Sequence, residues 1–383
     1  MTMRDKPPFR ADHVGSLLRP KKLLDAREEF LGPQTPDQNL GPHDNAGLRA
    51  VEDECVREVA QMQADAGLSG ATDGEFRRRS WWLEMAMNWD GFSATRQGKS
   101  SPFGWKNNDG KQQDFSVLTV TGKIGWNPSP VVEAFRFLAD NTALTPKVTM
   151  PAPSVIHCFA GGDPAILESA YDDIEEFWSD LTDAYRKEIA ALVDAGARYI
   201  QLDDVSLPFL CDDDYAGVFQ SWGLSPEDML RVYAKRINDV LAGAPDDVTF
   251  TMHTCRGNRE GLWAAEGGYD PVADILFNDI NVTGYFMEYD TPRAGTFEPL
   301  RLLPEGKVVA LGIMSSKAPV VEEADALKAR IDEAARHAPL ERLAVAPQCG
   351  FASSIVGNPL TEDIEKAKLA RLVEVAEAVW GTA

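Results

Sequence analysis

Residues 246–258 read DDVTFTMHTCRGN, a short β-type apolar run that ends in the pair His253 and Cys255. Similar runs are closed by Glu288 in VTGYFME and by Cys349 in LAVAPQC. Residues i and i+2 of an extended strand point to the same side, so His253 and Cys255 can bind one ion together. Two thiolates, an imidazole and a carboxylate are ligands that suit Zn²⁺. The sequence therefore predicts a zinc site built from His253, Cys255, Glu288 and Cys349.

Runs of this kind recur along the chain, and amphipathic helical stretches separate them. The expected strands are His13–Ser16, Leu68–Glu75, Lys147–Pro151, Arg198–Asp203, Val248–Cys255, Ile280–Glu288, Lys307–Met314 and Arg342–Cys349. The expected helices include Asp173–Ala195, Ser225–Ala244, Val321–Ala338 and Thr361–Val379. This alternation is typical of α/β proteins with a parallel sheet, and eight βα units over roughly 370 residues predict a (β/α)₈ TIM barrel. No G-x-G-x-x-G motif follows the first strand, which disfavours a dinucleotide-binding fold.

We expect residues 1–383 to form one barrel domain that carries insertions. The segment Glu28–Ala46 is rich in Pro, Gly and Asn and predicts an extended surface loop. The aromatic-rich segment Trp81–Asn127 contains the alternating run Val117–Ile124, which predicts a hairpin-containing insertion around residues 81–127. A lid over the site and a homodimer contact are two open alternatives for this insertion.

Composition and charge exclude several classes of partner. The formal net charge is −22, and such an acidic surface repels nucleic-acid backbones and anionic membranes. No apolar stretch approaches the ~20 residues of a membrane span, and the N-terminus lacks the apolar region of a signal peptide. The five cysteines are an odd number and widely spread, which does not indicate a disulfide framework. The expected compartment is the cytoplasm, where reduced thiols are available to a metal.

Other polar residues stand where the predicted strands end, which is where a barrel gathers its working groups. Asp203 and Asp204 can bind an ammonium group or act as acid and base, or one of them can cap the next helix. Glu75 either faces the site or forms a salt bridge with the arginines Arg77–Arg79. Ser16, which follows a glycine, either donates hydrogen bonds to a carboxylate or belongs to a plain turn.

Six motifs of the chain carry a family resemblance. In order and spacing, HVGSLLRP, DGEF, QLDD, H-x-C-R-G-N, MEYDTPRAG and PQCG resemble the catalytic barrel of cobalamin-independent methionine synthase, and its short single-barrel relatives most closely. The resemblance spans nearly the whole chain. It implies a (β/α)₈ barrel whose zinc is held by the four residues named above. It also implies that the amino-acid end of a homocysteine-like thiol is bound by Ser16, Glu75 and Asp203.

The resemblance implies a zinc-dependent thiol S-methyltransferase, an enzyme of methionine biosynthesis that methylates homocysteine or a similar thiol to give methionine. A negatively charged ligand set keeps a bound sulfur electron-rich, which favours sulfur attack over water activation. The nearest enzymatic alternative is a zinc-dependent thiol transferase that opens epoxides, as epoxyalkane:coenzyme M transferase does. A decarboxylase of the uroporphyrinogen type would not need the zinc set. A purely structural zinc protein is the non-enzymatic alternative.

Three departures from the full-length enzymes concern the methyl donor. The chain lacks the preceding second barrel, and Phe209 stands where those enzymes have an acidic residue. Ser315 or Ser316 lies nearest to the position of their histidine after the seventh strand. We therefore expect a donor other than methylfolate, such as a methylcobalamin-carrying protein or another activated methyl compound, because its leaving group needs no protonation.

Three further residues offer weaker signals for the missing acid or for an anion site. His13 and His157 are expected to be ordinary hydrogen-bonding residues rather than the missing acid. Lys317 either holds an anionic group or is a solvated surface lysine.

Overall fold

The computed structural model describes residues 6–33, 42–94, 102–106, 113–114, 118–161 and 170–383. Its centre is a sheet of six parallel strands, in which each strand pairs with the next one along the chain. The strands are β7 (Val148–Pro151), β8 (Tyr199–Asp204), β9 (Thr249–Thr254), β10 (Gly284–Glu288), β11 (Val308–Met314) and β12 (Leu343–Pro347). All seven residues of β11 are buried, as expected for a parallel strand that is covered on both faces.

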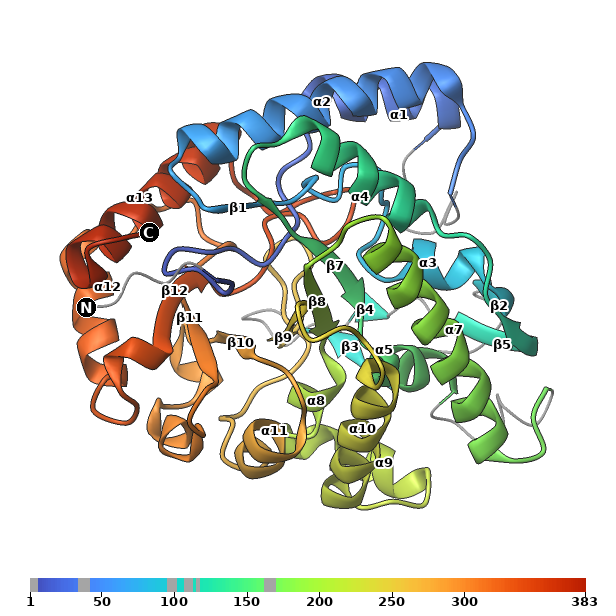
Figure 1. Ribbon diagram of the computed structural model, residues 1–383. Helices are drawn as coiled ribbons and strands as arrows, with labels where there is room; N and C mark the ends of the chain where they lie inside the picture. Colours follow the sequence, from blue (N-terminus) through green and yellow to red (C-terminus); the bar gives the residue numbers. More distant parts are fainter. Residues whose placement is uncertain (1–5, 34–41, 95–101, 107–112, 115–117, 162–169) are drawn as a thin grey trace.

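Two further segments close this sheet into a barrel. β1 (Gly70–Ala71) pairs in parallel with β6 (Thr145–Pro146), which leads directly into β7. At the other edge, Ala11 forms a parallel bridge with Val345 of β12. The same N-terminal segment reaches back to the end of β1, where the Leu17 N–H donates to the Gly74 carbonyl at 3.1 Å. The chain is therefore an α/β protein with the predicted (β/α)₈ barrel (Figure 1).

Long helices surround the strands, and side-chain caps define where several of them begin (Figure 1). The longer helices are α1 (Lys21–Leu31), α2 (Ala46–Asp65), α4 (Pro130–Asn141), α7 (Ile174–Asp194), α10 (Pro226–Leu241), α12 (Ala324–Ala334) and α13 (Glu362–Trp380). Ser225 caps α10 by accepting from the Asp228 N–H at 3.1 Å, with Pro226 in the first turn, as the sequence predicts. None of the described helices is long and apolar enough to cross a membrane.

Short helices fill the βα connections. They are α3 (Leu83–Asn88), α5 (Pro153–Ile156), α8 (Ser206–Phe209), α9 (Ala216–Ser221), α11 (Ala273–Asp279) and the π-helix η1 (His157–Gly161). The 3₁₀ turns are η2 (Asp213–Tyr215), η3 (Pro292–Ala294), η4 (Glu298–Leu302) and η5 (Leu340–Arg342).

The segment between β1 and β6 contains two antiparallel pairs. β2 (Asp90–Ala94) pairs with β5 (Leu118–Gly125), which is the alternating run that the sequence singled out. β3 (Gly104–Trp105) pairs with β4 (Gln113–Asp114). Antiparallel strand pairs thus lie in the part of the chain where the sequence predicts an insertion.

Four expected elements differ from those observed. The strand expected over His13–Ser16 is replaced by the bridge at Ala11, because the His13 N–H donates to the Asp12 carboxylate rather than to a neighbouring strand. The strand expected over Leu68–Glu75 is reduced to Gly70–Ala71. The strand expected from Ile280 begins only at Gly284. The surface loop expected at 28–46 is helical up to residue 31, and its residues 34–41 lie outside the described part of the chain.

Candidate active site

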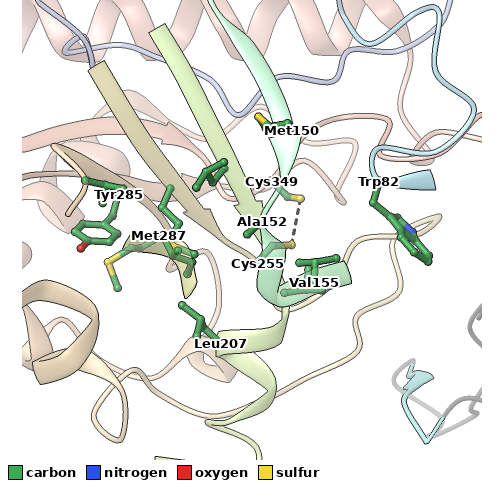
Figure 2. Close-up of a cluster of buried hydrophobic side chains, with 14 of the residues drawn as sticks. Trp82, Met150, Ala152, Val155, Leu207, Cys255, Tyr285, Met287 and Cys349 are labelled. Atoms are coloured by element: carbon green, nitrogen blue, oxygen red, sulfur yellow. Dashed lines mark hydrogen bonds between the residues drawn. The ribbon is translucent and has the colours of Figure 1, made fainter. Parts of the chain in front are cut away.

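Three of the four predicted metal ligands come together at the C-terminal mouth of the barrel. His253 in β9, Cys255 directly after it and Cys349 after β12 place their ligand atoms within 4.8 Å of one another. The two sulfur atoms are 3.2 Å apart, and Figure 2 shows them facing each other. The three residues are 3%, 3% and 6% exposed, so a bound ion would be shielded from water.

The orientation of His253 suits a metal ligand. Its Nδ1 lies 3.1 Å from the carbonyl oxygen of Phe286, and a carbonyl can only accept, so Nδ1 carries the proton. Nε2 then keeps its lone pair, and this buried atom has no hydrogen-bond partner among the described residues. A carbonyl that fixes the imidazole tautomer in this way is usual behind a metal-bound histidine. The donor set therefore fits a zinc ion.

The two thiols are not equivalent. A hydrogen bond from Cys255 lowers the pKa of Cys349 well below its usual range against the effect of burial, and Lys317 adds to this shift. Burial raises the pKa of Cys255, which acts as the donor of the pair. The surroundings of the pair thus favour the thiolate at Cys349 and the thiol at Cys255.

Glu288, the fourth predicted ligand, is engaged by cationic and backbone donors. Its Oε2 accepts from the Arg256 N–H at 2.9 Å, and its Oε1 lies 3.1 Å from Arg293 Nη2 and 3.8 Å from Lys317 Nζ. Burial acts to raise the pKa of Glu288, but Lys317, Arg256 and Arg293 outweigh it and lower the pKa to about 2. The carboxylate is therefore ionised next to the Cys255 loop, and its role as a ligand stays a prediction.

One cavity joins the metal group to the three residues predicted to bind substrate. Ser16, Glu75 and Asp203 line the same cavity as His253, Cys255 and Cys349. All three are buried, because the βα loops fold over them. Polar groups from five segments, the N-terminal one and the C-terminal ends of β1, β8, β9 and β12, therefore face one cavity.

Glu75 is held by its neighbours but keeps one oxygen available. Its backbone is in the left-handed region (φ 59°), and the Asp73 carboxylate accepts from its N–H at 2.9 Å. Thr149 Oγ1 donates to Oε1 at 2.8 Å, and Arg78 lies 3.6 Å from the same oxygen. The salt bridge that the sequence predicts between Glu75 and one of the arginines is therefore made with Arg78. Oε2 has no partner among the described residues. Burial raises the pKa of Glu75 although Arg78 opposes this shift.

The carboxylates of Asp203 and Asp204 have different roles. Asp203 lines the cavity, and its Oδ1 accepts from Gln201 Nε2 at 2.7 Å. Burial raises the pKa of Asp203 to about 7, against the opposing effect of His253. Asp204 accepts instead from the N–H of Leu207 at 2.7 Å and from the hydroxyl of Ser206 at 3.0 Å, which caps α8. The capping alternative derived from the sequence is therefore realised by Asp204, and ammonium binding by Asp203 stays a prediction.

Arg19 fastens three loops together beside this cavity. Its guanidinium donates to the carbonyls of Glu75 (2.8 Å) and Arg78 (2.7 Å), and to those of Ala352 (3.0 Å) and Ser354 (3.1 Å). The loop after β1 thus becomes tied to the loop after β12. The sequence motif HVGSLLRP contains this arginine, but nothing in it reveals the four carbonyl partners.

An aromatic wall also lines the cavity, and the sequence analysis did not identify it. The wall consists of Trp81, Trp82, Trp105, Phe159 and Phe209. Figure 2 shows the Trp82 side chain on the same side of the barrel as the two cysteines. The Trp81–Trp82 pair and the high aromatic content of the insertion were the available signals.

The insertion reaches across the barrel mouth. The Lys106 N–H donates to the Trp263 carbonyl at 2.6 Å, and the Trp263 N–H donates back at 3.2 Å. Phe103 stacks on Phe209 with ring centroids 4.4 Å apart and planes inclined by 7°. Of the two alternatives for the insertion, its position over the cavity agrees with a lid, and the homodimer contact stays a prediction.

The weaker candidates have other partners. His13 bonds Gln63 at 2.8 Å and His157 bonds Tyr233 at 3.1 Å, and neither lines the cavity. Burial lowers the pKa of His13 to about 4 and that of His157 to about 3, so both are neutral at pH 7. Ser316 donates to the Gly350 carbonyl at 2.9 Å. Lys317 is not a solvated surface lysine, because it lies near Glu288 and donates to the Gly257 carbonyl at 2.9 Å.

Known proteins resemble the chain over nearly its whole length. The family model for the catalytic domain of cobalamin-independent synthase matches residues 141–378. The uncharacterized protein YxjH of Bacillus subtilis is 39% identical over 98% of this chain and 96% of its own length. The methionine synthase of Pyrococcus abyssi is 25% identical over 88% of this chain and 85% of its own. The crystal structure of a putative vitamin-B12 independent methionine synthase from Listeria monocytogenes matches with a TM-score of 0.73 and 33% identity, over 98% of both chains.

Proposed function

The chain belongs to the cobalamin-independent methionine synthase family, and on this basis we propose that it is a zinc-dependent thiol S-methyltransferase of methionine biosynthesis. It would transfer a methyl group to homocysteine or a similar thiol and so form methionine. The observation that carries this proposal is the meeting of a His/Cys/Cys metal group with two buried carboxylates in one cavity. We further propose that residues 1–383 act as a single catalytic barrel in the cytoplasm, where all five cysteines can stay free as observed.

Zinc would be held by His253, Cys255 and Cys349, with Glu288 as the fourth predicted ligand. When bound there, the ion would lower the pKa of the acceptor thiol so that it is a thiolate at neutral pH. The paired thiols and the unpartnered His253 Nε2 support this assignment. Lys317, Arg256 and Arg293 keep Glu288 ionised and hence able to bind a cation.

The polar residues that line the cavity outside the metal group would position the acceptor thiol. Glu75 offers one unpartnered carboxylate oxygen, and Asp203 offers a second carboxylate in the same cavity, so together they can bind the ammonium group of an amino acid. The hydroxyl of Ser16 can donate to the carboxylate of the same amino acid. At Glu75 and Asp203 a sulfonate-bearing thiol would meet carboxyl groups in place of a cation, which favours homocysteine over coenzyme M and methyl transfer over epoxide opening.

The aromatic wall supports the expectation that the donor is not methylfolate. Phe209 presents an apolar ring to the cavity, and the hydroxyl of Ser316 is already used by a carbonyl. Neither side chain can protonate a folate nitrogen as it leaves. A methylcobalamin-carrying protein or another activated methyl compound remains the proposed donor.

Metal analysis of cysteine variants tests the zinc assignment. We expect about one Zn²⁺ per chain in the wild-type protein and a large loss of zinc in Cys255→Ser and Cys349→Ser. Cys55→Ser is the matched control, because Cys55 is a buried free cysteine in α2 that is not part of the metal group. Full zinc occupancy in both site variants would refute the assignment. If loss of zinc also unfolds the chain, the structural-zinc alternative is favoured instead.

Product analysis tests the reaction. Zinc-loaded protein is incubated with homocysteine or with coenzyme M, each in the presence of free methylcobalamin or of triglutamylated methylfolate. We expect methionine from homocysteine and no methylated coenzyme M, and more methionine with methylcobalamin than with the folate. Faster turnover with the folate would overturn the donor assignment only. Methylation of coenzyme M in preference to homocysteine would overturn the acceptor assignment.

A further inference from the structure

We propose that the aromatic side of the cavity is a subsite for a small onium methyl donor, meaning a sulfonium or quaternary ammonium compound. This inference rests on the proposed function and specifies which activated methyl compound the site accepts. It follows from the shape of the aromatic wall, from the charges in the cavity and from the chemistry of the leaving group.

The rings of the wall are inclined to one another rather than parallel. Trp82 and Phe159 have ring centroids 5.0 Å apart with planes inclined by 60°, and Phe159 and Phe209 follow at 6.2 Å and 56°. A flat heteroaromatic donor binds best to a parallel ring face. One parallel contact is already made within the protein, because Phe103 stacks on Phe209 at 7°. Inclined rings present differently oriented aromatic faces and edges, which a rounded group such as a cluster of methyl groups on a central cation can contact better than a flat ring can.

The charges around the cavity favour a cation on this wall. Aromatic faces attract onium groups through the negative potential of their π-systems, and Trp does so best. The carboxyl groups of Glu75 and Asp203 face the same space, and a cation beside them favours their ionised forms. The cationic side chains that line the cavity are Arg79 and Arg259, and Arg259 lies 3.6 Å from the carboxylate of Glu260.

The chemistry of an onium donor matches these surroundings. The acceptor thiol releases its proton to water and its sulfur attacks the methyl carbon, so that a new C–S bond forms. The bond between that carbon and the onium sulfur or nitrogen breaks, and its electron pair stays on the heteroatom. The leaving group is a neutral sulfide or tertiary amine and needs no proton. The side chains of Trp82, Trp105, Phe159 and Phe209 can therefore serve the donor although none of them is an acid.

The closed mouth of the cavity also favours a small donor. Arg19 ties the loop after β1 to the loop after β12, and Ile355 N–H donates to the Arg79 carbonyl at 2.8 Å. Trp105 lies against the Cys255 loop, so close that a Cβ on Gly257 would be 3.0 Å from its ring. Trp82 and Trp105 are 5% and 8% exposed. A compact onium compound can occupy such a space without displacing these contacts.

A binding experiment tests the subsite without turnover. Choline is titrated into the zinc-loaded protein by calorimetry, and 3,3-dimethylbutanol, its neutral carbon analogue, is titrated in parallel. We expect choline to bind at least tenfold more tightly, and we expect this preference to be lost in Trp82→Leu or in Trp105→Leu. Trp126→Leu is the control, because Trp126 does not line this cavity and bonds Glu188 instead. Equal binding of the two probes would overturn the inference, and so would an unchanged preference in both wall variants.

Turnover separates this inference from the proposed function. The zinc-loaded protein and homocysteine are incubated in parallel with dimethylsulfonioacetate, glycine betaine, methylcobalamin and methylfolate. Methionine formed with either onium compound supports the inference, and the two arms distinguish a sulfonium from an ammonium donor. Methionine formed only with methylcobalamin or methylfolate overturns the inference and leaves the methyltransferase standing. No methionine with any donor counts against both.

Discussion

Gln201 and Thr149 show how single side chains prepare a buried carboxylate for a ligand. Each donates one hydrogen bond, Gln201 to Asp203 at 2.7 Å and Thr149 to Glu75 at 2.8 Å. The second oxygen of Glu75 remains unpartnered among the described residues, and burial disfavours the charged form of both acids. A substrate ammonium would compensate this unfavourable burial, which is a physical reason for its binding there.

Substitution of these carboxylates tests their role as the ammonium site. We expect Glu75→Gln and Asp203→Asn each to raise the KM for homocysteine by about 10–100-fold, because a charge-assisted hydrogen bond contributes about 1.5–3 kcal/mol. Zinc content should stay at the wild-type level in both variants. Steady-state kinetics and metal analysis check the two expectations. A loss of zinc with unchanged KM would instead place these residues in the metal site.

The sequence predicts the metal group only as far as local geometry reaches. His253 and Cys255 lie two residues apart at the end of one strand, so their proximity follows from the strand itself. Cys349 joins them because parallel strands end at the same mouth. The ion pairs of Glu288 with Arg293 and Lys317 could not be predicted, because those cations come from loops whose paths are set by tertiary packing.

At the scale of elements, helix α13 supports the loop that carries Ser16. Glu365 of α13 accepts from the Leu18 N–H at 2.8 Å, and burial raises the pKa of this carboxyl to about 8. An unfolded chain would titrate the same group near pH 4.3. The native state therefore keeps a proton that the unfolded state has released at neutral pH.

This difference predicts a pH-dependent stability. The contribution of Glu365 to the free energy of unfolding is fully present below about pH 4. It is lost as the pH rises towards about 8, at up to about 1.4 kcal/mol per pH unit. Glu365→Gln keeps the acceptor for Leu18 but cannot ionise, so we expect it to gain stability over the wild-type protein between pH 5 and pH 8. Urea unfolding at several pH values measures this, with the exposed Glu377→Gln as control. A constant difference across the pH range would contradict the assignment.

Arg19 acts between elements, since its four carbonyl partners belong to two loops. Lysine cannot reproduce the planar fork, so we expect Arg19→Lys to lower the free energy of unfolding by about 2–4 kcal/mol. Arg301→Lys is the control, because the Arg301–Glu298 ion pair is exposed and should contribute little. If both substitutions lower the free energy of unfolding equally in urea, the four hydrogen bonds of Arg19 contribute little to stability.

At the scale of the whole molecule, the order of elements was predictable and the closure of the mouth was not. Eight apolar runs separated by helical patterns indicate the barrel, because each run must be buried on both faces. Lys106, directly after β3, forms an antiparallel bridge with Trp263. The two residues are far apart in the sequence, and no local pattern encodes their contact. The aromatic wall is missed for the same reason, since its side chains come from the insertion and from separate βα loops.

X-ray absorption at the zinc edge, with and without homocysteine, tests the central claim that the barrel mouth activates a thiol. The account predicts that homocysteine replaces a nitrogen or oxygen neighbour of zinc by a sulfur, because a catalytic site keeps an exchangeable position. Asp203→Asn should require a higher homocysteine concentration for the same change. A zinc spectrum that is unaltered by homocysteine or by any other thiol would contradict the claim.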